Sequence, residues 1–172
     1  MIEESTTKRV LAIFFDNPTK QFHLRELSRT ARLSLPTIIL STEKLTREKL
    51  IVKKKGKVVT QVHAQRENTD FIRKKRVYNL QKIYDSGIVE DLESTFNHPR
   101  AIILFGSFSR GEDTEDSDID IAIITSKKRA FNTGKYEQIF KRSVNLHEVD
   151  LAKTSHEFKA NLYNGIILEG SW

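Results

Sequence analysis

The amino-acid sequence predicts an α+β protein built from two parts. Apolar residues recur at helical spacing through roughly the first 50 residues, and two short β-rich stretches around a glycine follow them. Beyond residue 100, a continuous apolar run and a second strand-length stretch that is apolar after its two aspartates flank a polar, acidic loop. Net charge divides in the same way, with +11 over residues 1–84 and −5 over residues 85–172. We therefore expect a basic first part and an acidic second part with different roles.

Composition limits the chemistry that is open to this chain. Its 172 residues contain no cysteine, which excludes disulfides, thiolate nucleophiles and cysteine-ligated zinc. The apolar runs are too short for a membrane-spanning helix, so we expect a cytoplasmic protein with no membrane partner. Carboxylate, hydroxyl and phosphate chemistry remain.

The first part begins with three predicted helices. The first spans residues 6–15 and the second spans residues 24–31, where apolar side chains keep helical spacing. Ser34 is a good N-cap and Pro36 suits a first helical turn, so a third helix is predicted from there. Residues 51–62 then predict a β-hairpin with a lysine-rich tip.

This order of elements resembles the winged helix-turn-helix family over roughly residues 5–66. The resemblance implies DNA as a partner, with the third helix in the major groove and the hairpin on phosphates. The residues that it assigns to DNA are Ser34, Thr37, Ser41 and Lys44 of the helix and Lys53, Lys54, Lys55 and Lys57 of the hairpin. Winged helices also serve as protein-docking or dimerisation modules, so that alternative stays open.

A helical connector is predicted over residues 67–98. The stretch has no proline and one glycine, Gly87, and its apolar residues keep helical spacing on either side of residues 85–87. We expect two helices there, joining a domain at residues 1–66 to a domain at residues 99–172.

The second domain carries the clearest chemical signal. Residues 101–105 form a continuous apolar run, which predicts a strand buried on both faces, and the run ends at Gly106-Ser107. Free N–H groups at such a corner suit a phosphate. Asp118 and Asp120 begin the next strand and share one face, because side chains alternate along a strand. Two neighbouring carboxylates repel unless a cation lies between them, so they predict a Mg²⁺ site.

Gly106-Ser107, Arg110-Gly111 and residues 117–121 together resemble the signature of the minimal nucleotidyltransferases of the DNA polymerase β superfamily. The resemblance covers residues 100–170 and implies a small mixed sheet with flanking helices. It also implies that Gly106, Ser107 and Arg110 bind a nucleoside triphosphate, with ATP as the expected one. Two Mg²⁺ ions on Asp118 and Asp120 would then support in-line attack on the α-phosphate, and pyrophosphate would leave.

The same family places a third carboxylate on a following strand, and the sequence leaves its identity open. Residues 144–146 offer the expected apolar neighbours around an amide, Asn145, whereas residues 149–151 offer an acid, Asp150. Asp150 is the preferred third catalytic residue, with Glu148 or no acid at all as the alternatives. His147 is a further candidate base.

These features favour an enzyme that moves a nucleoside monophosphate, AMP in the first instance, from Mg-NTP to an acceptor hydroxyl and that also binds DNA. Small members of the family resemble antitoxins that adenylylate a partner toxin, so a partner protein is an expected acceptor. The alternative is a DNA-binding regulator whose nucleotidyltransferase fold has lost turnover, which an asparagine at the third acidic position would favour. A core of about 70 residues is near the lower limit for stability, so we also expect a homo-oligomer.

Overall fold

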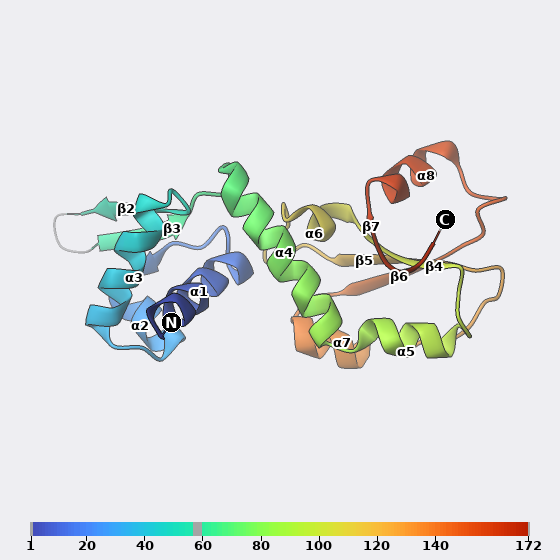
Figure 1. The fold of residues 1–172 in the computed structure, drawn as a ribbon, viewed down its shortest axis with the longest axis horizontal. Helices are drawn as coiled ribbons and strands as arrows, with labels where there is room; N and C mark the ends of the chain where they lie inside the picture. Colours follow the sequence, from blue (N-terminus) through green and yellow to red (C-terminus); the bar gives the residue numbers. More distant parts are fainter. Residues whose placement is uncertain (1, 57–59, 172) are drawn as a thin grey trace. The chain divides into compact units, whose positions relative to one another are not determined.

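The structure is a computed structural model that describes residues 2–56 and 60–171. It divides into two compact units, Met1–Lys75 and Arg76–Trp172, and the boundary falls within helix α4 (Thr69–Asp85) (Figure 1). No helix in the described ranges is long and apolar enough to cross a membrane.

Within the described residues, the first unit contains three helices, the beginning of α4 and a small antiparallel sheet (Figure 1). The three helices are α1 (Ile2–Asp16), α2 (Leu24–Ala31) and α3 (Leu35–Arg47). The strands β2 (Ile51–Lys55) and β3 (Thr60–Ala64) form the predicted hairpin, and β1 (Phe22–His23) pairs with β3. Apolar side chains of α1, α2, α3 and β3 are buried in its core, among them Phe14, Leu27, Ile38, Leu45 and Val62. The hydroxyl of Ser34 accepts a hydrogen bond from the Thr37 N–H at 3.3 Å, which confirms Ser34 as the N-cap of α3.

The second unit is built on a four-stranded mixed sheet in the order β6-β5-β4-β7. Its strands are β4 (Ala101–Phe105), β5 (Ile119–Ile124), β6 (Val144–Val149) and β7 (Ile166–Gly170). β4 pairs antiparallel with β5 and β7, whereas β5 and β6 are parallel. The α+β class and the small mixed sheet with flanking helices are confirmed.

Helices cover both faces of this sheet (Figure 1). The end of α4, α5 (Ile88–Thr95) and α7 (Gly134–Phe140) share one apolar core with alternate side chains of β4 and β5. On the opposite face, α8 (His156–Tyr163) packs Leu162 and Phe158 against the remaining alternate side chains. The short helix α6 (Gly106–Arg110) follows β4 directly. Every residue of β4 is buried, as the continuous apolar run predicted.

Candidate functional site

The pairing of three strands brings the predicted site residues of the second unit to one end of the sheet. Phe105, the last residue of β4, lies opposite Asp120 of β5, and Asp120 lies opposite Asn145 of β6. Paired residues in a sheet project to the same face, so Asp120 and Asn145 stand side by side. Asp118 lies one residue before β5 begins, and its side chain is exposed.

The backbone of Gly106 packs directly against the carboxylate of Asp120. Its φ of +74° lies in the left-handed region, and a Cβ at this position would lie 2.5 Å from Oδ2 of Asp120. A side chain here would therefore strain the backbone and displace the carboxylate at the same time. Ser107 is half-buried beside it, and Arg110 is exposed at the end of α6, where its Nε donates a hydrogen bond to Glu112 at 2.7 Å.

Asn145 bridges the two aspartates. Its Nδ2 donates to Oδ2 of Asp118 at 3.2 Å and to Oδ1 of Asp120 at 3.3 Å. These long hydrogen bonds supply partial positive charge between two carboxylates that would otherwise repel each other. The amide thus occupies the position that is level with Asp120 on the neighbouring strand, where the family resemblance implies a third acid.

The structure does not bring Asp150 to the aspartate pair, which corrects the preference for it as the third catalytic residue. The parallel register pairs Val149 with Ile124, so Asp150 follows the far end of β6, five residues beyond Asn145. At the usual rise per residue this separation is about 16 Å. The Asp150 carboxylate instead accepts from the Ala152 N–H at 3.0 Å and pairs with Lys153 at 3.5 Å.

His147 follows Asn145 on the same face of β6 and lies close to Asp120. Its Nε2 is 3.6 Å from Oδ1 of Asp120, and its ring contacts Phe105 and Phe158 with centroid separations of 5.2 and 5.7 Å. Nε2 is buried and finds no hydrogen-bond partner among the described residues. A buried polar atom without a partner is costly, so a polar group bound beside Asp120 would offer it one.

These residues fit the cation and triphosphate that the resemblance implies. In the ranges that the structure describes, no group of three His, Cys, Asp or Glu side chains is gathered into a metal cage. Mg²⁺ in nucleotide sites needs no such cage, because one or two carboxylates and the substrate phosphates commonly complete its shell. The exposed carboxylate of Asp118 and the half-buried one of Asp120, beside a corner without a side chain, meet that requirement.

A buried ion pair fixes the loop that leads to Asp118. The Arg142 guanidinium lies 3.2 Å from Oδ2 of Asp113, and the two side chains are 7% and 0% exposed. Arg142 also donates to the carbonyls of Thr114 and Ser117, the residue before Asp118. From α4, Asn79 donates to Oδ1 of Asp113 at 2.7 Å. Sequence reasoning missed this network, because its members are far apart in the chain and belong to no motif.

Removal of Asp113 should therefore destabilise the second unit. Asp113→Ala leaves Arg142 buried without its counter-charge, and breaking a buried pair from one side typically costs about 3–5 kcal/mol. Glu112→Ala is the matched control, because the exposed Glu112–Arg110 pair should contribute less than about 1 kcal/mol. Urea denaturation followed by circular dichroism measures both. Equal losses of stability for the two variants would contradict the assigned role of Asp113.

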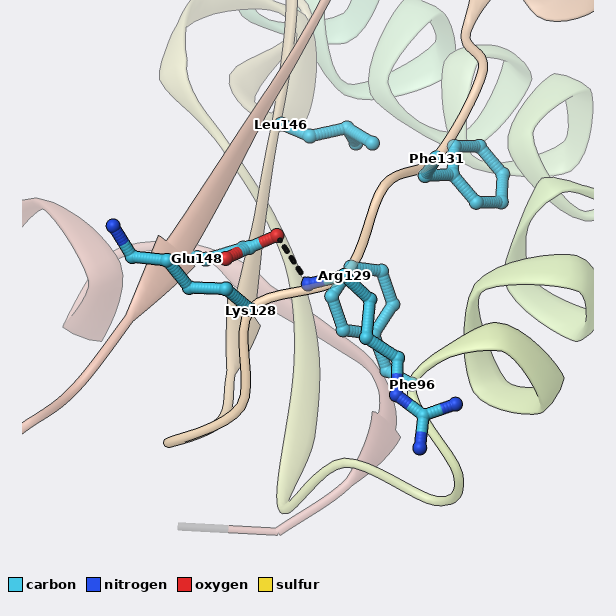
Figure 2. Close-up of a pocket in the computed structure, with 6 residues that line it drawn as sticks. All are labelled: Phe96, Lys128, Arg129, Phe131, Leu146 and Glu148. Carbon is cyan, nitrogen blue, oxygen red and sulfur yellow. Dashed lines mark hydrogen bonds between the residues drawn. The ribbon is translucent and has the colours of Figure 1, made fainter.

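A cavity of 340 Å³ opens on the other face of β6 (Figure 2). It is lined by Phe96, Lys128, Arg129, Phe131, Leu146 and Glu148. Glu148, the alternative third acid, accepts a hydrogen bond from the Arg129 backbone N–H at 3.1 Å in this cavity. Leu146 and Glu148 alternate with Asn145 and His147 along the strand, so this cavity does not share a face with the aspartate pair.

In the first unit, the residues of α3 that were predicted to contact DNA differ in how exposed they are. Ser34 and Thr37 share a hydrogen bond between their hydroxyls at 2.7 Å, and Lys44 is half-buried. Ser41 is only 5% exposed and lies on the core side of the helix with Ile38, so its hydroxyl cannot reach a base edge. This corrects the prediction for Ser41.

The hairpin and α2 supply the remaining cations. Lys53 is 17% exposed and lies 3.8 Å from Glu43, whereas Lys54 is exposed. The side chain of Lys55 and all of Lys57 lie outside the described residues. Sequence reasoning missed two exposed arginines on α2, Arg25 and Arg29, although their spacing of four residues places them on one side of that helix.

Arg25 and Arg29 line a groove of about 750 Å³ between α2, α3 and the hairpin. The remaining lining residues are His23, Leu24, Glu26, Leu35, Ile39 and Thr60. Glu26 is held 2.9 Å from Lys20, and this contact lowers the pKa of the Glu26 carboxyl. The lining of the groove therefore combines the apolar side chains of Leu24, Leu35 and Ile39 with polar and charged ones, including two exposed arginines.

The chain matches a known protein family over its second half. The family model described as "Polymerase beta, Nucleotidyltransferase" matches residues 88–171, from α5 to the end of β7. A search of curated proteins finds no match for the chain. The matched range includes Gly106, Asp118, Asp120 and Asn145. It supports the nucleotidyltransferase superfamily for the second unit and, in general terms, nucleotidyl transfer as its activity.

Proposed function

We propose that the second unit transfers a nucleoside monophosphate, AMP in the first instance, from a magnesium–nucleoside triphosphate to an acceptor hydroxyl. The observation that carries the proposal is the contact between Gly106 and Asp120, where a Cβ would lie 2.5 Å from the carboxylate. A corner without a side chain lets the backbone lie close to a metal-binding carboxylate and to a ligand bound there. The family match over residues 88–171 supports the same reaction class.

Each residue of the site has a part in this reaction. Asp118 and Asp120 would hold the cations, and the corner at Gly106 and Ser107 would receive the triphosphate, with Arg110 exposed nearby to meet its charge. When bound, two Mg²⁺ ions would neutralise charge on the attacking and leaving oxygens. The acceptor hydroxyl releases its proton to solvent water as its oxygen forms a bond to the α-phosphorus, the bond from that phosphorus to the bridging oxygen breaks, and pyrophosphate leaves.

The first unit, in this proposal, is a winged helix that binds DNA. The exposed cations Arg25, Arg29, Arg47 and Lys54 support this role, because phosphate contacts need accessible positive charge. The acceptor would be a hydroxyl of a partner protein, such as a toxin in an antitoxin-like pair. The proposed reaction would take place in the cytoplasm, which contains both nucleoside triphosphates and DNA.

Asn145 favours a second candidate function. An amide cannot accept the proton of an acceptor hydroxyl, and Asn145 lies level with Asp120, where the resemblance implies a third acid. A protein with this site could bind a nucleotide without turnover and serve as a DNA-binding regulator. Turnover therefore separates the two functions, whereas nucleotide binding does not.

Two forms of radiolabelled ATP test the proposed transfer. The purified chain is incubated with Mg²⁺, a cell extract as the source of acceptor, and ATP that carries ³²P at the α or the γ position. Nucleotidyl transfer should label an acceptor from α-labelled ATP only, and EDTA should abolish the label. Label from γ-labelled ATP would indicate phosphoryl transfer and contradict the proposal. Intact ATP binding without any label would contradict the enzyme and favour the regulator.

A further inference from the structure

The exposed face of α3 has an apolar residue at its centre. Four exposed side chains recur at helical spacing along this face: Pro36, Leu40, Glu43 and Arg47. Leu40 is 62% exposed, whereas Ile38 and Leu45 of the same helix are buried in the core. The middle of this exposed face therefore has no Arg, Lys, Asn or Gln side chain.

The chemistry of these four side chains restricts what they can recognise in DNA. Guanine is read by paired donors from Arg or Lys, and adenine by Asn or Gln, which combine a donor with an acceptor. Pro36 and Leu40 have no side-chain donor or acceptor. Glu43 only accepts, which suits the amino group of cytosine, but it lies 3.8 Å from Lys53. Arg47 is a donor, but it is the last residue of the helix.

The thymine 5-methyl group is the apolar feature on a base edge in the major groove. A leucine side chain at the centre of a recognition face can contact that methyl group and exclude water from both. The exposed cations of this part of the first unit include Arg25 and Arg29 on α2 and Arg47 at the end of α3, and Lys44, one turn after Leu40, is half-buried. This is the division of roles expected when cations hold phosphates and a central side chain reads bases.

We propose that Leu40 is a specificity-determining residue of the first unit and that it recognises thymine in duplex DNA through the 5-methyl group. The proposal rests on the DNA binding proposed above and adds the chemical group that is read. It requires α3 to enter the major groove with its Leu40 face toward the bases.

Replacement of thymine by uracil in the DNA isolates this interaction. The probes are two duplexes of equal length with alternating A·T or A·U pairs, which have the same charge and the same hydrogen-bonding groups and differ in the methyl groups. The full chain should bind the A·U duplex about fourfold more weakly for each thymine methyl group that Leu40 would have buried. Leu40→Ala should bind both duplexes with equal affinity, and the affinity of each protein should fall steeply with salt.

A matched control separates this effect from a general reduction of apolar surface. Ile139 on α7 is 50% exposed in the second unit, so Ile139→Ala should keep the preference for the A·T duplex. Equal binding of both duplexes by the unaltered chain would overturn the role of Leu40 and leave DNA binding intact, as would a Leu40→Ala variant that still prefers the A·T duplex. Failure of the unaltered chain to bind either duplex at low salt would instead contradict DNA binding itself.

Discussion

Replacement of Asp118 by asparagine should abolish nucleotidyl transfer and leave the second unit folded. The side chain is exposed and accepts the 3.2 Å hydrogen bond from Asn145, so an isosteric amide costs little stability. The substitution removes one of the two negative charges that would hold the cations. Metal binding of this kind contributes several kcal/mol of transition-state stabilisation, so the rate should fall by at least about 100-fold.

The measurement compares the rate of acceptor labelling from α-labelled ATP with the affinity for Mg²⁺ determined by calorimetry. Asp116→Asn is the matched control, since Asp116 is an exposed acid two residues before Asp118 in the same loop, and the hydrogen bond from Asn145 goes to Asp118. It should retain the activity and the Mg²⁺ affinity of the unaltered chain. Equal losses in both variants would indicate a general effect of loop charge and contradict a cation site at Asp118.

The secondary structure of the second unit could be predicted from local patterns. The run at residues 101–105 and the alternating residues 119–124 became β4 and β5 with little change in their bounds, because a strand buried on one or both faces leaves a direct pattern in the sequence. The break between α4 and α5 falls at Gly87, which adopts the left-handed conformation that favours glycine. Local geometry alone determines these features.

The third acidic position depended on strand pairing, which local patterns do not determine. Both Asn145 and Asp150 have apolar neighbours, and only the parallel register with β5 decides which of them is level with Asp120. The Asp113–Arg142 pair was missed for the same reason, because its contacts are tertiary. Ser41 was misassigned because a helix of the first unit has several polar residues, and sequence alone did not separate its exposed side from its buried side.

Asn145→Asp should convert the site into one with a general base. A carboxylate that takes the proton of the acceptor hydroxyl typically contributes about 10²–10⁴-fold to a rate, so labelling from α-labelled ATP should increase by an amount within that range. The new charge would lie beside Asp118 and Asp120, to which the amide now donates at 3.2 and 3.3 Å. Without a cation the three carboxylates repel, so the variant should be less stable than the unaltered chain in EDTA and should gain more stability on addition of Mg²⁺.

Asp150→Asn is the control that the structure supplies for this prediction. Asp150 lies five residues farther along the chain from Asn145 and has its own partners in Ala152 and Lys153, so its replacement should change neither the rate nor the Mg²⁺ dependence of stability. Thermal unfolding with and without Mg²⁺ measures the charge effect even where no acceptor is labelled. An inactive unaltered chain with an active Asn145→Asp variant would favour the regulator, because one amide then accounts for the lost turnover. If Asn145→Asp changed neither the labelling rate nor the Mg²⁺ dependence of stability, Asn145 would not occupy the third position of a cation site. Its position level with Asp120 would then play no part in catalysis.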